Sequence, residues 1–208
     1  MTRGGKPICA HYAGTVSLPV ETTGEDVREL VAYLRNKTRA TRTGATLAET
    51  ADSVRPEIVS GRKLAAYETW GLVEREGDRL TLAPRGWELA QRPETERTVF
   101  REILDSIPPY RSALEWMHHR GFADVTTADV RAQWQEHHIA ALGSSNGNTI
   151  RENVVAFFRL AEAAGLGQLT QGGGRGRTPT RFTIDREELK SLVEAGPTAV
   201  AAVGRLTS

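Results

Sequence analysis

The sequence has one cysteine, few lysines and no long apolar run. A single cysteine, Cys9, in 208 residues excludes an internal disulfide framework and is typical of a reducing compartment. No apolar stretch approaches the roughly 18 residues that a membrane span needs, and the first residues lack the apolar core of a signal peptide. We therefore expect a cytoplasmic protein with no membrane partner, associated with the nucleoid if it binds DNA.

The chain also has no excess of charge of one sign, because its net charge at pH 7 is only +1. Arginine outnumbers lysine by 23 to 4, a bias that is typical of a GC-rich genome and is no sign of nucleic-acid binding by itself. The total charge therefore says little about partners, and the places where cations cluster along the chain are more informative.

The motifs of common enzymes are absent from the sequence. It contains no P-loop, no GxSxG elbow, no GxGxxG after a strand and no CxxC. The pairs His118-His119 and His137-His138 do not have zinc-site spacing, and neighbouring side chains on a helix diverge by about 100°. We expect no enzymatic activity, no cofactor and no metal site.

The first part of the chain reads as three helices followed by a hairpin. Apolar residues at helical spacing over 27–34 predict the first helix, and Thr46 with Glu49 predicts a capping box at the start of the second. Pro56 is placed to begin a third helix, which Gly71 ends. The segment "LVEREGDRLTLA" then alternates around a Gly-Asp turn, which predicts a two-stranded hairpin.

The second part repeats this plan about 94 residues later. Thr126 or Thr127 is placed to cap a second helix, and "TIRENVVAFFRLAEAAGL" predicts a third helix with Phe158 in its apolar stripe. That helix ends at Gly165, as the earlier one ends at Gly71. "GQLTQ" and "TRFTID" then flank "GGGRGRTP" as a second hairpin. A repeat of this length indicates a duplicated domain architecture.

The phrase "WGLVEREGDRLTLAPRGWELA" resembles the winged helix-turn-helix regulators of the MarR and PadR type. The matching residues are Gly71, Leu72, Val73, Leu82, Pro84, Arg85 and Gly86. The resemblance covers residues 26–92 and implies a mainly α fold with small β-hairpin wings (α+β), in which two winged helix-turn-helix modules are joined by a linker helix. It also implies DNA binding.

Five segments follow from this interpretation. They are a flexible N-terminal segment (1–23), a first winged-helix domain (24–92), a linker helix (93–107), a second winged-helix domain with a C-terminal helix (108–196), and a flexible tail (197–208).

Three groups of residues are candidates for contacts with DNA. The stretch "RNKTRATRTGAT" has no acidic residue and offers Arg35, Lys37, Arg39 and Arg42 to phosphates, unless it is only a solvated loop. The two third helices offer Arg55, Ser60, Arg62, Lys63, Asn146, Asn148, Thr149 and Arg151 to base edges. Either asparagine is equally suited to a cap. The second hairpin offers Arg175, Arg177 and Arg181 to phosphates or the minor groove, unless it is only a mobile basic hairpin.

The function expected from these features is sequence-dependent binding of double-stranded DNA by a tandem winged-helix protein, as in a bacterial transcriptional regulator. The alternative is a winged-helix adaptor that binds proteins within a larger nucleoprotein or defence assembly, which the near-neutral net charge also suits. A homodimer or a protein partner is compatible with either hypothesis.

Overall fold

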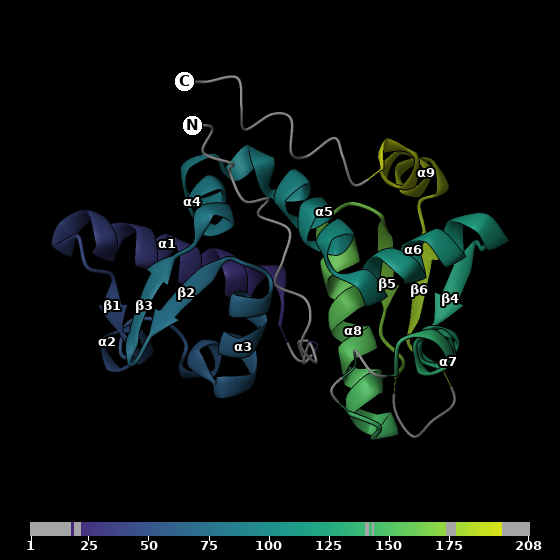
Figure 1. Ribbon diagram of the computed structural model, residues 1–208, viewed down its shortest axis with the longest axis horizontal. Helices are drawn as coiled ribbons and strands as arrows, with labels where there is room; N and C mark the ends of the chain where they lie inside the picture. The colour runs from purple at the N-terminus through teal and green to yellow at the C-terminus, as the bar shows by residue number, and fades with distance from the viewer. Residues whose placement is uncertain (1–17, 19–21, 140–141, 143, 174–177, 197–208) are drawn as a thin grey trace, which may run out of the picture.

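The computed structural model describes residues 18, 22–139, 142, 144–173 and 178–196 (Figure 1). Within these residues the chain is mainly helical and carries two small antiparallel sheets of three strands each. This agrees with the predicted mainly α class with small β elements. No helix in the described part of the chain is long and apolar enough to cross a bilayer.

The first half of the molecule, residues 22–91, contains four α-helices, a 3₁₀ helix and three strands. In chain order these are α1 (Gly24–Thr41), β1 (Ala45–Thr46), α2 (Leu47–Ala51), the 3₁₀ helix Pro56–Val59, α3 (Gly61–Thr69), β2 (Val73–Glu76), β3 (Arg79–Leu82) and α4 (Pro84–Gln91).

The second half, residues 108–196, follows the same order of elements. A short 3₁₀ helix (Pro93–Thr95) and α5 (Glu96–Ser106) come between the halves, and then α6 (Pro108–Arg120), β4 (Asp124–Thr126), α7 (Thr127–His137), α8 (Gly147–Ala163), β5 (Gly167–Thr170), β6 (Arg181–Ile184) and α9 (Arg186–Ala195).

Both sheets have the same topology, with strand orders β1-β3-β2 and β4-β6-β5. The sequence predicted only the hairpins β2–β3 and β5–β6. In each half a third strand, just before the second helix, also pairs with the last hairpin strand: Ala45 lies opposite Leu80, and Val125 lies opposite Phe182. These two strands of two and three residues are too short to show an alternating pattern.

The third helix of each half ends in the same way. Gly71 and Gly165 both have positive φ, +67° and +73°, which favours glycine. In the first half the N–H of Leu72 donates to the carbonyl of Tyr67 at 2.9 Å, and in the second half the N–H of Leu166 makes the equivalent bond at 2.9 Å. Gly71 and Gly165 are therefore equivalent, as predicted, in their φ angle and in the hydrogen bond made by the leucine that follows each of them.

The helix starts expected from the sequence are present as well. Thr46 and Glu49 form a capping box at the start of α2, and Thr126 forms one with Asp129 at the start of α7. A third box at the start of α1 uses Thr23, whose side chain accepts a hydrogen bond from the N–H of the third helical residue. Each capping box supplies a hydrogen-bond acceptor to a backbone N–H group that has no partner within the helix.

One continuous hydrophobic core runs through both halves. Between them, α5 packs against α4, α6 and α8 (Figure 1), and it contributes four buried apolar side chains. Leu64 of α3 and Phe158 of α8 are buried, as the sequence predicted. Leu18 and Thr22 are buried too, so part of the N-terminal segment 1–23 belongs to the packed molecule.

Candidate nucleic-acid interface

Lys63 does not lie where the sequence predicted it. It was expected on the outer face of the third helix, but it is buried, and its Nζ atom donates to Oδ2 of Asp26 at 2.9 Å. One helix was expected from Pro56 to Gly71, whereas the chain is extended at Ser60, with ψ 146°, between the 3₁₀ helix and α3. Lys63 therefore cannot contact DNA without breaking a buried ion pair.

Arg55 is also engaged within the first half. Its backbone N–H and its Nε atom both donate to the Glu29 carboxylate, at 2.9 and 2.8 Å, and its Nη2 atom lies 3.1 Å from Asp26. These bonds hold the pKa of Glu29 below its ordinary value, with the backbone hydrogen bond the largest cause. Ser60 and Arg62 remain exposed at the start of α3.

The surface around α3 carries charges of both signs in nearly equal number. The β2–β3 hairpin has three acidic and two basic residues. Its two arginines make bonds within the chain: Arg75 donates to the Gly77 carbonyl, and Arg79 donates to Thr43. Around α3 and this hairpin the exposed acidic residues are Glu57, Glu68, Glu74, Glu76 and Asp78, and the exposed basic residues are Arg55, Arg62, Arg75 and Arg79. This surface therefore lacks the cationic excess of the β5–β6 hairpin.

The stretch 35–42 is helical for most of its length. Arg35, Lys37 and Arg39 lie on the last turns of α1, and Arg42 caps that helix with φ +61°. Lys37 pairs with Glu49 of α2 at 2.8 Å, and this bond is the main reason that the pKa of Glu49 falls to about 2. Arg39 and Arg42 are exposed and have no ion pair with another described residue.

At the start of α8 the predicted residues have two different roles. Asn146 is the N-cap, because its Oδ1 atom accepts hydrogen bonds from the N–H groups of Asn148 and Thr149 at 2.9 and 3.4 Å. The capping alternative therefore holds for this asparagine. Asn148 and Arg151 are exposed on the first two turns of α8.

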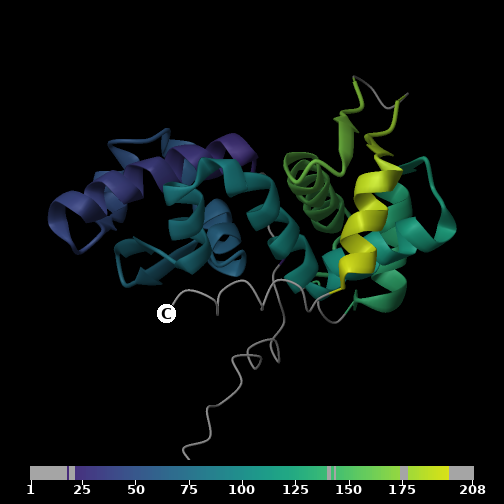
Figure 2. The same cartoon turned by 90° about the horizontal axis from the view of Figure 1, so that it is seen from above.

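The β5–β6 hairpin differs in charge from the β2–β3 hairpin of the first half. Its segment 167–184 has three arginines and no acidic residue. Arg181 opens β6, is exposed, and lies 3.4 Å from the carboxylate of Asp124 on β4. Arg175 and Arg177 fall outside the described residues. The strands that lead to them extend beyond the neighbouring helices (Figure 2).

Three further arginines near these elements were missed by the sequence reasoning. Arg131 of α7 lies at the start of α8, where its Nη1 atom would be 3.7 Å from a methyl group on Gly147. Arg159 lies two turns after Arg151 on the outer side of α8, and Arg28 lies on α1. Their spacing in the sequence could have indicated a shared helix side. Arg28, Arg35 and Arg39 recur at i, i+7 and i+11. Arg151 and Arg159 are eight residues apart on the predicted third helix of the second half.

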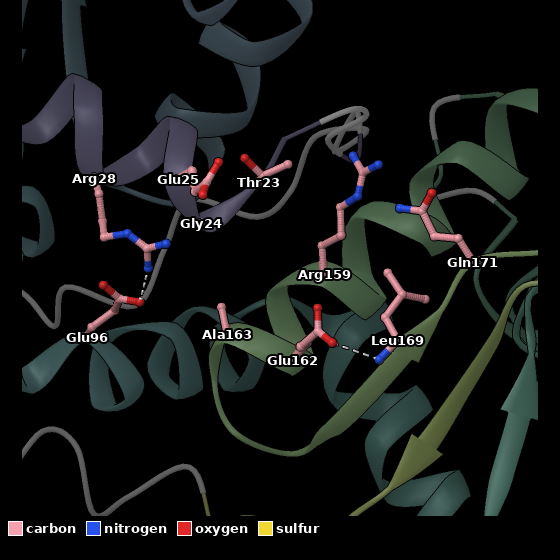
Figure 3. Close-up of a pocket in the computed structure, with 10 residues that line it drawn as sticks. All are labelled: Thr23, Gly24, Glu25, Arg28, Glu96, Arg159, Glu162, Ala163, Leu169 and Gln171. Atoms are coloured by element: carbon pink, nitrogen blue, oxygen red, sulfur yellow. Dashed lines mark hydrogen bonds and ion pairs between the residues drawn. The ribbon is translucent and has the colours of Figure 1, made fainter.

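A cleft of about 420 Å³ separates the start of α1 from the outer side of α8 (Figure 3). Arg28 enters it from α1 and pairs with Glu96 at 2.7 Å, while Arg159 enters it from α8. Glu162 accepts a hydrogen bond from the N–H of Leu169 at 2.9 Å and so ties α8 to the base of the hairpin. The cleft is therefore lined by two arginines, one from each half, and by the carboxylates of Glu25, Glu96 and Glu162.

No described group of three or more histidine, cysteine, aspartate or glutamate side chains is arranged to hold a metal ion. Comparisons of the chain with protein-family models, with characterised proteins and with solved structures gave no significant match. The surface is therefore interpreted from its own residues.

Proposed function

We propose that the protein binds double-stranded DNA in a sequence-dependent manner through tandem winged-helix modules, as a bacterial transcriptional regulator does. The observation that carries the proposal is the surface formed by α8 and the β5–β6 hairpin. It combines an exposed arginine and asparagine on the first turns of a helix with a hairpin that has no acidic residue.

The topology of each half supports the winged-helix interpretation. Both halves run helix, strand, helix, helix, hairpin, helix, and in both the first strand pairs with the second strand of the hairpin. In a helix-turn-helix the second helix of the pair enters the major groove. In this proposal α8 is that helix in the second half, and the β5–β6 hairpin is the wing beside it.

Arg151 and Asn148 are the proposed base-reading residues. A guanidinium can donate two hydrogen bonds to guanine O6 and N7, and a side-chain amide can bond adenine at N6 and N7. Both side chains are exposed, and neither Arg151 nor its neighbour Asn148 has a side-chain bond to another described residue. Asn146 is excluded from base reading, since its side-chain oxygen caps α8.

Selection of preferred duplexes from a random pool, followed by binding measurements, tests this function. Arg151→Gln should weaken binding to the preferred site by about 1–3 kcal/mol and flatten discrimination at one base position. Arg62→Gln is the matched control, because Arg62 is exposed near the start of α3. It should leave the preference unchanged. A pool that yields no preferred sequence contradicts the proposal.

The adaptor alternative is favoured by one observation, the small acidic excess of the β2–β3 hairpin, which has three acidic and two basic residues. Such a surface is suited to a basic region of another protein. If the adaptor hypothesis is right, the protein should co-purify with a partner and bind no duplex at low salt. If DNA binding is right, affinity should fall steeply as salt rises, because phosphate contacts release counterions.

A further inference from the structure

The exposed side of α1 carries a row of arginines along its length. Arg35 and Arg39 follow Arg28 by 7 and 11 residues, so at 100° per residue both lie within about 20° of it around the helix. Ala32 and Asn36 fill the same side. The buried side chains of α1 are Asp26, Val27, Leu30, Val31 and Leu34. Four of them lie about 100° or more from Arg28 around the helix, and Val31 lies about 60° from it. We call Arg28, Arg35, Arg39 and the capping Arg42 the α1 row.

The acidic residues of α1 do not neutralise the far end of this row. Glu25 is exposed on the first turn near Arg28, Asp26 is buried with Lys63, and Glu29 is held by Arg55. Among the row itself, Arg28 pairs with Glu96. The Nε atom of Arg35 is buried without a hydrogen-bond partner in the described chain, and Arg39 is exposed. The positive potential of the row therefore increases away from Arg28.

The row begins beside the C-terminal end of α8, whereas Asn148 and Arg151 lie on the first two turns of the same helix. A methyl group on Gly24 would lie 3.6 Å from Cβ of Ala163 on α8, and the cleft between α1 and α8 brings Arg28 and Arg159 to its two sides (Figure 3). From there α1 extends outward for 18 residues. At 1.5 Å per residue this corresponds to about 27 Å.

Helix α1 and the β5–β6 hairpin lie on the same side of the molecule. In Figure 2, α1 runs along the upper edge of the first half and the β5–β6 hairpin rises from the same side of the second half. The β2–β3 hairpin, with its acidic residues, lies on the opposite edge. A duplex bound to α8 and the β5–β6 hairpin therefore has α1 beside it, and not the face that carries the acidic hairpin.

We propose that the α1 row binds the phosphate backbone of the same duplex that α8 and the β5–β6 hairpin bind. The inference rests on the proposed function, and it changes the role of the first half. The two halves use different elements: the second reads DNA through its third helix, whereas the first contacts phosphates through its first helix. α3 is then no recognition helix.

The length of α1 sets the size of the contact. The row runs from Arg28 to Arg42, and 14 residues at 1.5 Å each give about 21 Å, or roughly six base pairs at 3.4 Å per pair. A duplex of about 12 base pairs centred on the preferred site should engage α8 and the β5–β6 hairpin only. A duplex of about 24 base pairs should also reach the α1 row, bind more tightly, and show a steeper dependence on salt.

The test compares both duplexes with two double variants of equal net charge. Arg35→Gln with Arg39→Gln removes two cations of the row, and Arg62→Gln with Arg75→Gln removes two cations from the α3 and β2–β3 side. Binding of each protein to each duplex is measured by fluorescence anisotropy at several salt concentrations. Thermal melts check that every variant is folded. Arg39→Gln alone is the variant expected to disturb the fold least, since Arg39 is exposed.

On the long duplex the Arg35/Arg39 variant should have a log–log salt slope shallower by about two units than that of the natural protein. The advantage of the long duplex over the short one should then shrink to the contribution of Arg42, the remaining cation of the row beyond Arg28. Arg39→Gln should give about half of this change, and the Arg62/Arg75 variant should retain the full advantage of the long duplex.

Two other results can be told apart. If the natural protein binds both duplexes with the same affinity and slope, the α1 inference is overturned while DNA binding stands. If no duplex binds at low salt, the proposed function fails as well.

Discussion

The Nζ atom of Lys63 lies 2.9 Å from Oδ2 of Asp26, which joins α3 to the first turn of α1 through an ion pair that is almost fully enclosed, with side-chain exposures of 11% and 3%. Asp26 also accepts from the N–H of Thr23 at 3.0 Å in the capping box of α1. A residue that looked like a DNA contact in the sequence is therefore part of the framework of the first half.

The first prediction concerns the loss of this pair. Asp26→Asn leaves the Lys63 ammonium buried without a counter-charge, which should lower the free energy of unfolding by about 3–5 kcal/mol at pH 7. Urea denaturation measures it. Glu49→Gln is the matched control, because it removes an exposed pair with Lys37 of nearly equal length, 2.8 Å. It should change the urea midpoint far less.

The ion pair between Asp26 and Lys63 should also make the free energy of unfolding depend on pH in the acid range. Burial raises the pKa of the Asp26 carboxyl, but the hydrogen bonds from Lys63 and Thr23 together outweigh it and hold the pKa below its ordinary value of 3.8. The stabilisation is therefore complete above that value and is lost as the pH falls through the lower, folded-state pKa. The difference between natural protein and Asp26→Asn should shrink in that range. A difference that stays constant down to about pH 2 contradicts this assignment.

A second prediction concerns the two third helices. Leu64 and Phe158 are 4% and 0% exposed in one continuous core. Replacing Leu64 with Ala should cost about 2–5 kcal/mol, and replacing Phe158 with Ala about 3–5 kcal/mol, because each change removes apolar packing and leaves a cavity. Chemical denaturation at one temperature measures both. Near-neutral values at both positions are incompatible with the packing described.

The glycine that ends α3 gives a third prediction. Gly71 has φ +67° with space around it, so Gly71→Ala should cost about 1–2 kcal/mol through backbone conformation alone. Gly61 in the same helix has no atom within 4 Å of a built methyl group and no positive φ. Gly61→Ala should be neutral or slightly stabilising. Equal thermal shifts for the two variants argue against a left-handed end at Gly71.

The second hairpin gives a fourth prediction. Arg175→Ala with Arg177→Ala should weaken binding to all duplexes by a similar factor and make the salt slope shallower by about one unit for each phosphate that is no longer neutralised. The circular dichroism spectrum and the melting temperature should stay near those of the natural protein, because neither substitution removes an apolar side chain. Unchanged affinity and slope would leave the hairpin with no role in DNA binding and favour the adaptor hypothesis.

Local features of the fold could be predicted from the sequence, because their determinants lie within a few residues of one another. The capping box of Thr46 with Glu49 and the glycine ends at Gly71 and Gly165 are of this kind. Strands β1 and β4 could not be predicted, since each is only two or three residues long and is defined by its partner in a distant hairpin.

The candidate site shows the same division between local and distant determinants. Arg151 and Asn148 are exposed as predicted, since one helical stripe decides their position. The role of Lys63 depends on Asp26, 37 residues away, and on the break in the helix at Ser60, neither of which a local pattern reveals. The α1 row had a signal in its spacing, but Arg28 lies in the predicted first helix, 27–34, and the other arginines lie in the basic stretch that follows it, so the two were not joined.

The salt dependence of duplex binding tests the central claim most directly. With the α1 row beyond Arg28 and the second hairpin on the backbone, five arginines should each neutralise about one phosphate: Arg35, Arg39, Arg42, Arg175 and Arg177. The logarithm of the association constant for a preferred duplex of about 24 base pairs should then fall linearly with the logarithm of salt concentration, with a slope of about −4.5, at about −0.9 for each phosphate. Absence of binding at low salt, or a slope near zero, contradicts the account.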